Sequence, residues 1–394
     1  MKVAPRVETR PGALPKASGV GGVVPCWLAH TLLGCQTGFH LSVLHIGKKF
    51  IPRGIMLDKS TPTFDDTLYV VKDRLNKDGV VVYAIVRDAM FFLPAFLDHY
   101  RKLGVRSFFF LDDNSNDGTL EYLLEQSDCT VAGSARRYSD RIAGERAPHV
   151  WKSQIPHQFL LGRWALCADA DEFLCLPPSV RTLDALTDML NRRGATAMPA
   201  VMVDFYPRTV EQMESFGVPR TRDELFRSYP WFDAGPYFHW AKGERQPNTP
   251  FGGVRARLLS KYRIAHRRSA KSRVKKFLKS LRFRVGYGQN ISKVPLVKWR
   301  PQFHYRGAHS LNMAPDTDIL LPIAHFKFTA NLPMNIESAI TSGAYSGNSR
   351  AYFEYSKLID TIKANDGTFL GANSVRFEKV EDFRKHGLMK FKDP

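Results

Sequence analysis

The chain has 394 residues, enough for two domains or for one large domain with additions. Hydrophobic residues make up 44% of it, as in a globular protein with a core, and its formal net charge is +19. This charge predicts an anionic partner: nucleic acid, an anionic membrane surface, or an acidic or phosphorylated substrate. The five cysteines are odd in number and show no C-x-x-C spacing, which argues against a cysteine metal site and favours a reducing cytoplasm.

The N-terminal region does not resemble a membrane span or a signal peptide. Residues 17–47 carry no Lys, Arg, Asp or Glu, but Pro25, Gln36, three histidines and several glycines interrupt the apolar run. A span needs about 20 mainly apolar residues, and no A-x-A cleavage site follows. We therefore expect residues 1–60 to be a poorly ordered, non-catalytic extension, with Met56 as an alternative start of translation.

A regular pattern begins at residue 80. The run "VVVYAIV" predicts a strand over 80–86 that is buried on both faces. Apolar residues from Phe92 to Leu103 then recur on one helical face, which Gly104 ends. "SFFFLD" predicts a second strand over 107–112. A second helix follows, with Asn116 or Asp117 as its N-cap.

The alternation of strands and helices continues to residue 206. We predict strands over 129–134, 163–171 and 195–206, and helices over 151–162 and 182–194. Such alternation indicates an α/β fold with a parallel sheet, which binds its ligands beyond the carboxyl ends of the strands. Two acidic clusters, "LDDNSNDGT" and "ADADE", lie at those ends. Cys167 and Cys175 lie in apolar runs and are expected to be core residues.

The second half is less regular. The segment 266–284 holds nine Lys and Arg and no acid, with apolar residues at helical spacing. It predicts a basic amphipathic helix that attaches to an anionic membrane, or else a solvated basic face packed on the second domain. We divide the rest of the chain into an α/β half over 78–206, a second half over 207–360 and a C-terminal tail over 361–394.

The acidic clusters suggest two kinds of contact. Asp113, at a strand end, can accept hydrogen bonds from a nucleotide base or ribose, or can merely end the strand. In the predicted strand, Asp169 and Asp171 point to the same side and can share Mg²⁺ or Mn²⁺, which bridges to a diphosphate. A second D-x-D pair, Asp316 and Asp318, follows Pro315 with no strand before it, so we interpret it as a solvated turn.

Several segments of the sequence together resemble a known family. "YAIVRDAMFFLPAFLDHYRKLGVRSFFFLDDNSNDGTLEYL" and "RWALCADADEFL" are similar to bacterial glycosyltransferases of the family 2-like group with the GT-A fold, in particular to enzymes with a D-x-D-E-F motif. "GGVRARL", "ISKVPLVKWRPQFHYRGAHSL" and "IAHFKF" resemble the second half of that group. The resemblance covers about residues 80–360. It implies a GT-A fold, that is, a Rossmann-like, mostly parallel sheet with a less regular C-terminal half.

The resemblance also implies roles for single residues. Asp113 would contact the nucleotide base, Asp169 the ribose or a metal-bound water, and Asp171 the metal. Arg87 would lie beside the nucleotide, and His325 would return to the metal or diphosphate. The chain departs from the group directly after Arg87, where it has Asp-Ala in place of Asn-Glu.

A transferase that inverts the anomeric centre also needs a general base. No clear Glu-Asp pair follows "GGVRARL", and the candidates are Asp233 in "PWFDAGPY" and His309 in "GAHSL". Asp204 is a weaker candidate, because it can simply end a strand.

The leading interpretation is a cytoplasmic enzyme, peripheral on the inner face of the cell membrane, that uses Mn²⁺ or Mg²⁺. It would move a sugar from a nucleotide-diphosphate sugar, with a UDP-sugar favoured, to a saccharide or lipid-linked acceptor in surface polysaccharide or lipopolysaccharide synthesis. One alternative is a haloacid-dehalogenase-like phosphohydrolase with Asp169 as nucleophile, although Phe173 stands where those enzymes have Thr or Val. The other is a non-enzymatic nucleic-acid-binding protein, for which no known motif is present, so we expect no nucleic acid as partner.

Overall fold

The computed structural model describes residues 64, 68–235, 237–240, 249–264, 291–316, 318–345 and 347–391. All of them belong to one compact unit, Met56–Pro394. The predicted extension over 1–60 and the basic segment over 266–284 lie outside the described residues. Within the described part of the chain, no helix is long and apolar enough to cross a membrane.

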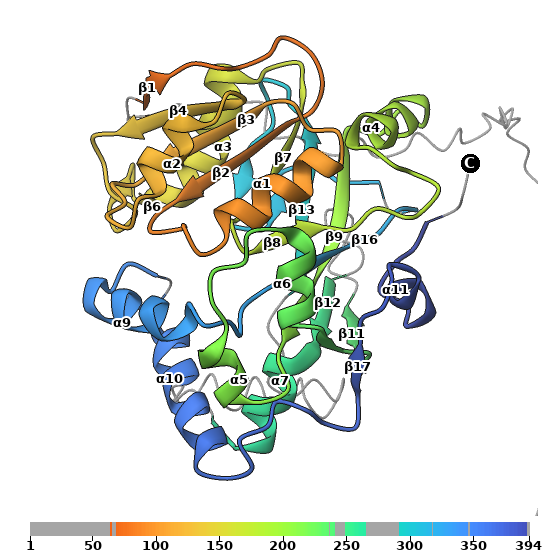
Figure 1. Ribbon diagram of the computed structural model, residues 1–394. Coiled ribbons are helices and arrows are strands. Elements are labelled where there is room, and N and C mark those ends of the chain that lie inside the picture. Colours follow the sequence, from red (N-terminus) through yellow and green to blue (C-terminus); the bar gives the residue numbers. More distant parts are fainter. Residues whose placement is uncertain are drawn as a thin grey trace, which may run out of the picture. The chain divides into compact units, whose positions relative to one another are not determined.

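Four neighbouring parallel strands form the first part of the central sheet. They are β2 (Val81–Val86), β3 (Phe108–Asp112), β4 (Cys129–Ser134) and β7 (Trp164–Cys167). Their order in the sheet is β4-β3-β2-β7, and every adjacent pair is parallel (Figure 1). The chain thus reverses its direction of winding between β2 and β7, and ligands of open α/β sheets bind at such a switch point. The α/β fold class predicted from the sequence is confirmed.

Strands from later in the chain complete a mixed sheet. β13 (Ser292–Lys298) lies antiparallel between β7 and β9 (Ala197–Tyr206). β16 (Leu321–His325) runs parallel to β9 and antiparallel to β8 (Glu172–Leu174), with His325 opposite Glu172. The remaining strands of the sheet are β1 (Leu68–Lys72), β10 (Trp231–Asp233) and β17 (Ser374–Arg376). The pairing of β16 with β8 places His325 beside the acidic turn that precedes β8.

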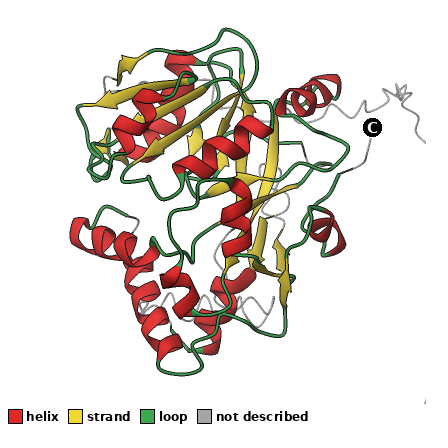
Figure 2. Ribbon diagram, viewed as in Figure 1, coloured by secondary structure: helices red, strands yellow, loops and turns green. Residues whose placement is uncertain are grey.

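Helices cover both faces of the sheet (Figure 2). Val82 and Ala84 of β2 pack with α1 (Leu93–Lys102), whereas Val81 and Tyr83 pack with α3 (Ala147–Phe159). This alternation follows from the two-residue period of a strand. The other helices of the described residues are α2 (Thr119–Glu125), α4 (Leu183–Arg192), α5 (Val210–Ser215), α6 (Arg222–Ser228), α7 (Gly253–Lys261), α9 (Leu332–Ser342), α10 (Arg350–Lys363) and α11 (Glu381–Lys385).

Among the described residues, three two-stranded antiparallel sheets lie outside the central sheet. They are β5 (Arg141–Ile142) with β6 (Glu145–Arg146), β11 (Tyr237–Trp240) with β12 (Thr249–Gly252), and β14 (Tyr305–Arg306) with β15 (Ser310–Leu311).

Three local predictions were wrong. The helix placed at 151–162 begins four residues earlier, because Pro148 can occupy the first turn of a helix without losing a hydrogen bond. The N-cap of α2 is Gly118, with a φ of 89°, although the Asp117 carboxylate accepts a hydrogen bond from the Thr119 N–H. The strand placed over 163–171 ends at Cys167, because residues 169–172 form a turn in which Glu172 N–H donates to the Asp169 carbonyl at 2.9 Å.

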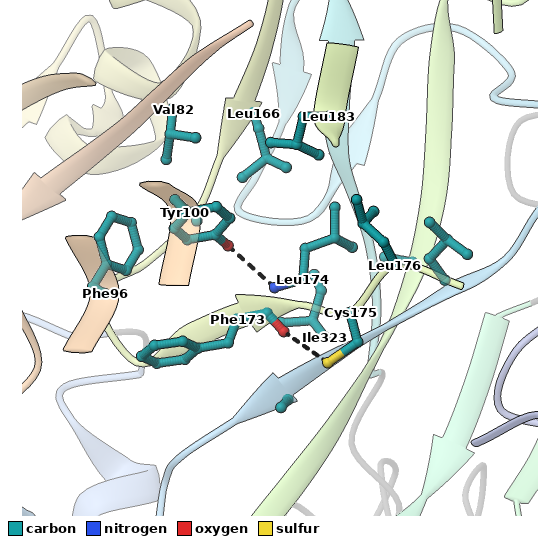
Figure 3. Close-up of a cluster of buried hydrophobic side chains, with 14 of the residues drawn as sticks. Val82, Phe96, Tyr100, Leu166, Phe173, Leu174, Cys175, Leu176, Leu183 and Ile323 are labelled. Carbon is teal, nitrogen blue, oxygen red and sulfur yellow. Dashed lines mark hydrogen bonds between the residues drawn. The ribbon is translucent and has the colours of Figure 1, made fainter. Parts of the chain in front are cut away.

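A cluster of buried hydrophobic side chains supports this turn (Figure 3). Phe173 packs edge-on against Phe96 of α1, with ring centroids 6.1 Å apart. The Tyr100 hydroxyl donates to the Glu172 carbonyl at 3.0 Å and accepts from the Leu174 N–H at 3.2 Å. α1 therefore holds β8 through both apolar packing and two hydrogen bonds. Cys167 and Cys175 are buried thiols, as predicted.

We expect Tyr100→Phe to lower the free energy of unfolding by about 1–3 kcal/mol, because it leaves two buried backbone groups without a partner. Urea unfolding of the purified variant measures this change. Tyr69→Phe is the matched control, since Tyr69 is 52% exposed on β1 and its substitution should leave stability unchanged. An unaltered unfolding midpoint for Tyr100→Phe would show that the hydroxyl does not hold β8 to α1.

Candidate functional site

A cavity of about 220 Å³ opens beyond the carboxyl ends of β2 and β7. Its charged wall consists of side chains from four separate segments of the chain. These are Arg87 and Asp88 after β2, Lys152 of α3, Asp169 and Asp171 in the turn after β7, and His325 and Lys327 at the end of β16. The cavity therefore lies at the switch point of the sheet and combines carboxylates with cations.

Two buried lysines neutralise the first part of the acidic turn. Lys152 Nζ lies 2.9 Å from Asp169 Oδ1, and Lys293 Nζ lies 3.6 Å from Asp169 Oδ2. Lys293 also contacts the carboxylate of Glu172, and both of these side chains are buried. Burial alone would raise the pKa of Asp169, but Lys152 and Lys293 hold that pKa well below its usual range. Asp169 is therefore a carboxylate, with 40% of its side chain exposed.

Asp171 faces His325 instead of a lysine. Its Oδ2 lies 3.4 Å from His325 Nε2, and the other ring nitrogen, Nδ1, lies 2.6 Å from Oδ1 of buried Asp204. Arg255 Nε donates to Asp204 Oδ2 at 2.6 Å. Burial would lower the pKa of His325, but Asp171 and Asp204 outweigh it and raise that pKa to about 9. Burial would likewise raise the pKa of Asp204, which Arg255 and His325 instead hold at about 2.

The pair of Asp171 and His325 fits a divalent cation. Mn²⁺ and Mg²⁺ are commonly bound through one or two protein ligands, with substrate phosphates and water completing the shell. The bond from Nδ1 to Asp204 orients the ring so that Nε2 faces Asp171, as carboxylates behind metal-binding histidines do. Among the described residues, no group of three or more His, Cys, Asp or Glu is placed to hold a metal by itself. Asp171 and His325 would supply two protein donors to a cation whose other ligands come from a bound phosphate and water.

Asp113 lies beside the cavity without lining it. Its side chain is fully buried, with Oδ2 3.4 Å from Arg87 Nη1 and Oδ1 accepting from the Tyr138 N–H at 3.1 Å. Burial raises the pKa of Asp113 above its usual value, and the Tyr138 N–H and Arg87 offset only part of that rise. Arg87 and Tyr138 both line the cavity, so Asp113 contacts two residues of its wall.

The loop after β2 is held to the loop after β3. Asp88 has a positive φ of 48° and accepts a hydrogen bond from the Asn116 N–H at 2.7 Å. Its own N–H donates to Ser115 Oγ at 2.9 Å. Asp88, which stands where the resembling family has Asn, thus has a side chain that can bind the neighbouring loop.

The two predicted general bases are not brought to the cavity wall. Asp233 is buried and paired with Arg257, whose Nε lies 2.7 Å away, and it also accepts a hydrogen bond from the Tyr206 hydroxyl. His309 Nδ1 lies 3.1 Å from the Ser292 carbonyl. Burial and Lys293 lower the pKa of His309 to about 3, so its ring is neutral. The assignment of a base to Asp233 or His309 stays a prediction.

The sequence interpretation did not single out Lys152 and Lys293. Lys293 interrupts the run "ISKVPLV", and Lys152 lies in "VWKSQIP" between apolar residues. A charged residue inside an apolar run is costly to bury unless it is paired, and this is the signal that could have indicated them. The second D-x-D pair lies elsewhere, where Arg193 contacts both Asp316 and Asp318.

No protein-family model and no curated protein matches the sequence. Among solved structures, the chain is similar to the crystal structure of S. aureus TarS, with a TM-score of 0.25 and 14% identity over 36% of this chain. The chain spans 23% of the length of that structure. A likeness of this size carries no argument about function, which has to rest on the geometry of the site.

The raised pKa of His325 predicts a pH dependence of stability in protein freed of divalent cations. The pKa of His325 is about 9 in the folded protein and 6.5 in its ordinary state. Protonated His325 therefore contributes fully to the free energy of unfolding below pH 6.5, and this contribution is lost as the pH rises to 9. We expect the free energy of unfolding in EDTA to fall by up to about 3 kcal/mol over this range. Urea titrations at several pH values measure the slope, which His325→Gln should remove. An equal slope in the variant would assign the titration to another group.

Proposed function

We propose that this chain is a metal-dependent glycosyltransferase that moves a sugar from a nucleotide-diphosphate donor to a hydroxyl of a saccharide or lipid-linked acceptor. The observation that carries the proposal is the composition of the cavity wall. Asp171 and His325 suit a shared cation, and Lys152, Lys327 and Arg87 bring positive charge to the same cavity. A diphosphate, bound at the switch point of an α/β sheet, is the ligand that this combination suits best.

The reaction would be a displacement at the anomeric carbon of the donor sugar. The bond from that carbon to the diphosphate oxygen breaks, and its electron pair leaves with the diphosphate. The acceptor oxygen forms the new bond to the same carbon, and its proton passes to a general base. Negative charge therefore grows on the diphosphate as the reaction proceeds, and fixed cations are most useful at that place.

The charged residues at the cavity have different roles in this proposal. Asp171 and His325 Nε2 would hold the cation, whose chemistry is to stabilise the leaving diphosphate as a Lewis acid. Lys327 would contact the diphosphate directly, because it lies two residues beyond His325 on the same wall. Asp169 would bind a ribose hydroxyl or a metal-bound water with its exposed side. Lys152 and Lys293 would keep Asp169 ionised and in place.

The phosphohydrolase alternative fits the site less well. It requires Asp169 to be a free nucleophile, but both carboxylate oxygens of Asp169 lie within 3.6 Å of a lysine Nζ. Its general acid would be Asp171, whose pKa is lowered because His325 outweighs the effect of burial. A carboxyl group with a lowered pKa is a poor proton donor near pH 7.

We expect Asp171→Asn to abolish metal-dependent transfer while the protein remains folded. The substitution removes the charge that would hold the cation but keeps the size of the side chain. Loss of a residue that positions the charge-stabilising group typically costs a factor of about 10² or more in rate. Sugar transfer from UDP-sugars with Mn²⁺, together with a melting curve, measures both properties.

Asp318→Asn is the matched control, because Asp318 belongs to the other D-x-D pair and is 71% exposed. It should retain the wild-type rate. Full activity of purified Asp171→Asn would overturn the assignment of the cation to Asp171.

We also expect UDP with Mn²⁺ to raise the melting temperature of the wild-type protein, since a ligand that binds only the folded state stabilises it. Mn²⁺ alone should have a smaller effect, because the site provides few ligands of its own. A shift with RNA but not with UDP and Mn²⁺ would favour the nucleic-acid-binding alternative and contradict the proposal. A shift with inorganic phosphate alone would favour the phosphohydrolase.

A further inference from the structure

The wall of the cavity contributed by α9 differs from the charged wall. Asn331, Asn335, Ser338 and Ser342 line the cavity and are four, three and four residues apart. This spacing places them on one face of the helix. None of them is charged, and all can donate and accept hydrogen bonds. Figure 1 shows α9 beneath the arrowhead of β2, on the side of the sheet where that strand ends.

Asn331 is the most informative member of this face. It is 95% buried, yet its side chain lines the cavity. It occupies the N-cap position of α9, where an Asn side chain usually caps the helix, but here it makes no capping bond. Its side chain forms no hydrogen bond with any residue that the structure describes. Because the Asn331 side chain lines the cavity and the fold does not use its amide, that amide is available to a ligand in the cavity.

The next two residues of the face are also open to a ligand. The side chains of Asn335 and Ser338 form no hydrogen bond within the described part of the chain, and both line the cavity. Ser342 is used by the fold, because its hydroxyl donates to the Ala339 carbonyl at 3.5 Å and accepts from the Ala344 N–H at 3.3 Å. The α9 face therefore presents several hydrogen-bonding groups that the fold itself does not use.

Aromatic rings lie beside this polar face. Tyr138, Tyr345 and Tyr352 all line the cavity. The ring centroids of Tyr138 and Tyr345 are 5.3 Å apart, and those of Tyr345 and Tyr352 are 4.6 Å apart. Flat apolar faces next to neutral hydrogen-bonding groups suit a ligand that is itself both apolar and rich in hydroxyls. A pyranose has this character, since its C–H groups and its hydroxyls point in different directions.

From these observations we infer that the α9 face, defined as Asn331, Asn335, Ser338 and Ser342, is the subsite for the uncharged sugar of the donor. This inference rests on the proposed function, which places the diphosphate on the charged wall of the same cavity. The sugar is bonded directly to that diphosphate, so it has to lie within the cavity beside one of its other walls. The α9 face thereby selects among donors through their hydroxyl groups.

The test separates binding of the sugar from binding of the nucleotide. Isothermal titration in Mn²⁺ gives the affinity for UDP and for UDP-glucose, UDP-galactose and UDP-N-acetylglucosamine. We define the sugar increment as the association constant of the tightest-binding UDP-sugar divided by the association constant of UDP. We expect this increment to fall about tenfold in Asn335→Ala/Ser338→Ala, since two hydrogen bonds are lost, while the affinity for UDP stays within about twofold. Asn331→Ala should behave in the same way.

Thr341→Ala is the matched control, because Thr341 is an exposed residue of α9 that does not line the cavity. It should keep the full increment. The double variant alters only half-buried and exposed positions, so its fold, checked by circular dichroism, should be retained even if Asn331→Ala is unstable.

Three results would contradict the inference, and only one of them would also contradict the proposed function. An unchanged increment in the double variant would remove the sugar from α9 but leave the proposed function intact. An equal loss of affinity for UDP and UDP-sugars would show that α9 supports the nucleotide site and does not bind the sugar. If wild-type protein binds none of these nucleotides with Mn²⁺, the proposed function itself fails, and the inference fails with it.

Discussion

The candidate site depends on the burial of two lysines against an acidic turn. Asp169, Asp171 and Glu172 lie within four positions, and three carboxylates so close together repel one another. Lys293, buried within the sheet, contacts both Asp169 and Glu172, and Lys152 reaches Asp169 from α3. These two cations stabilise the turn because they offset the repulsion between its carboxylates. Both come from elements that are distant from the turn in the sequence. Removal of Lys293 would leave the buried carboxylate of Glu172 without its counter-charge, which is strongly destabilising.

The two aspartates of the turn, Asp169 and Asp171, have different partners and therefore different roles. Asp169 is paired with two lysines, whereas Asp171 faces the imidazole of His325. That imidazole is in turn held by Asp204 and Arg255, so a chain of alternating charges runs from the core to the cavity. Such a chain fixes one side chain in one orientation before any ligand arrives, and catalysis by charge stabilisation requires this kind of preorganisation.

Much of the first half could be predicted from the sequence, because its signals are local. Apolar runs identify β2, β3 and β4. The turn over 169–172 could not be predicted, since its conformation depends on Lys152 and Lys293 and on the hydrogen bonds of Tyr100 to β8. The pairing of β16 with β8 is also a long-range contact. Only the resemblance, and no pattern in the residues alone, connected His325 with Asp171.

The left-handed backbone at Asp88 restricts how this position can vary. Asp and Asn adopt a positive φ more readily than other residues with a side chain, and both carry a side-chain oxygen that can accept from the Asn116 N–H. Exchange between them is therefore nearly neutral for the backbone, although it changes the charge beside Arg87. Glycine would accommodate the same φ but would release the loop after β3 from the loop after β2. Position 88 can therefore be either Asp or Asn while the ends of β2 and β3 keep their positions.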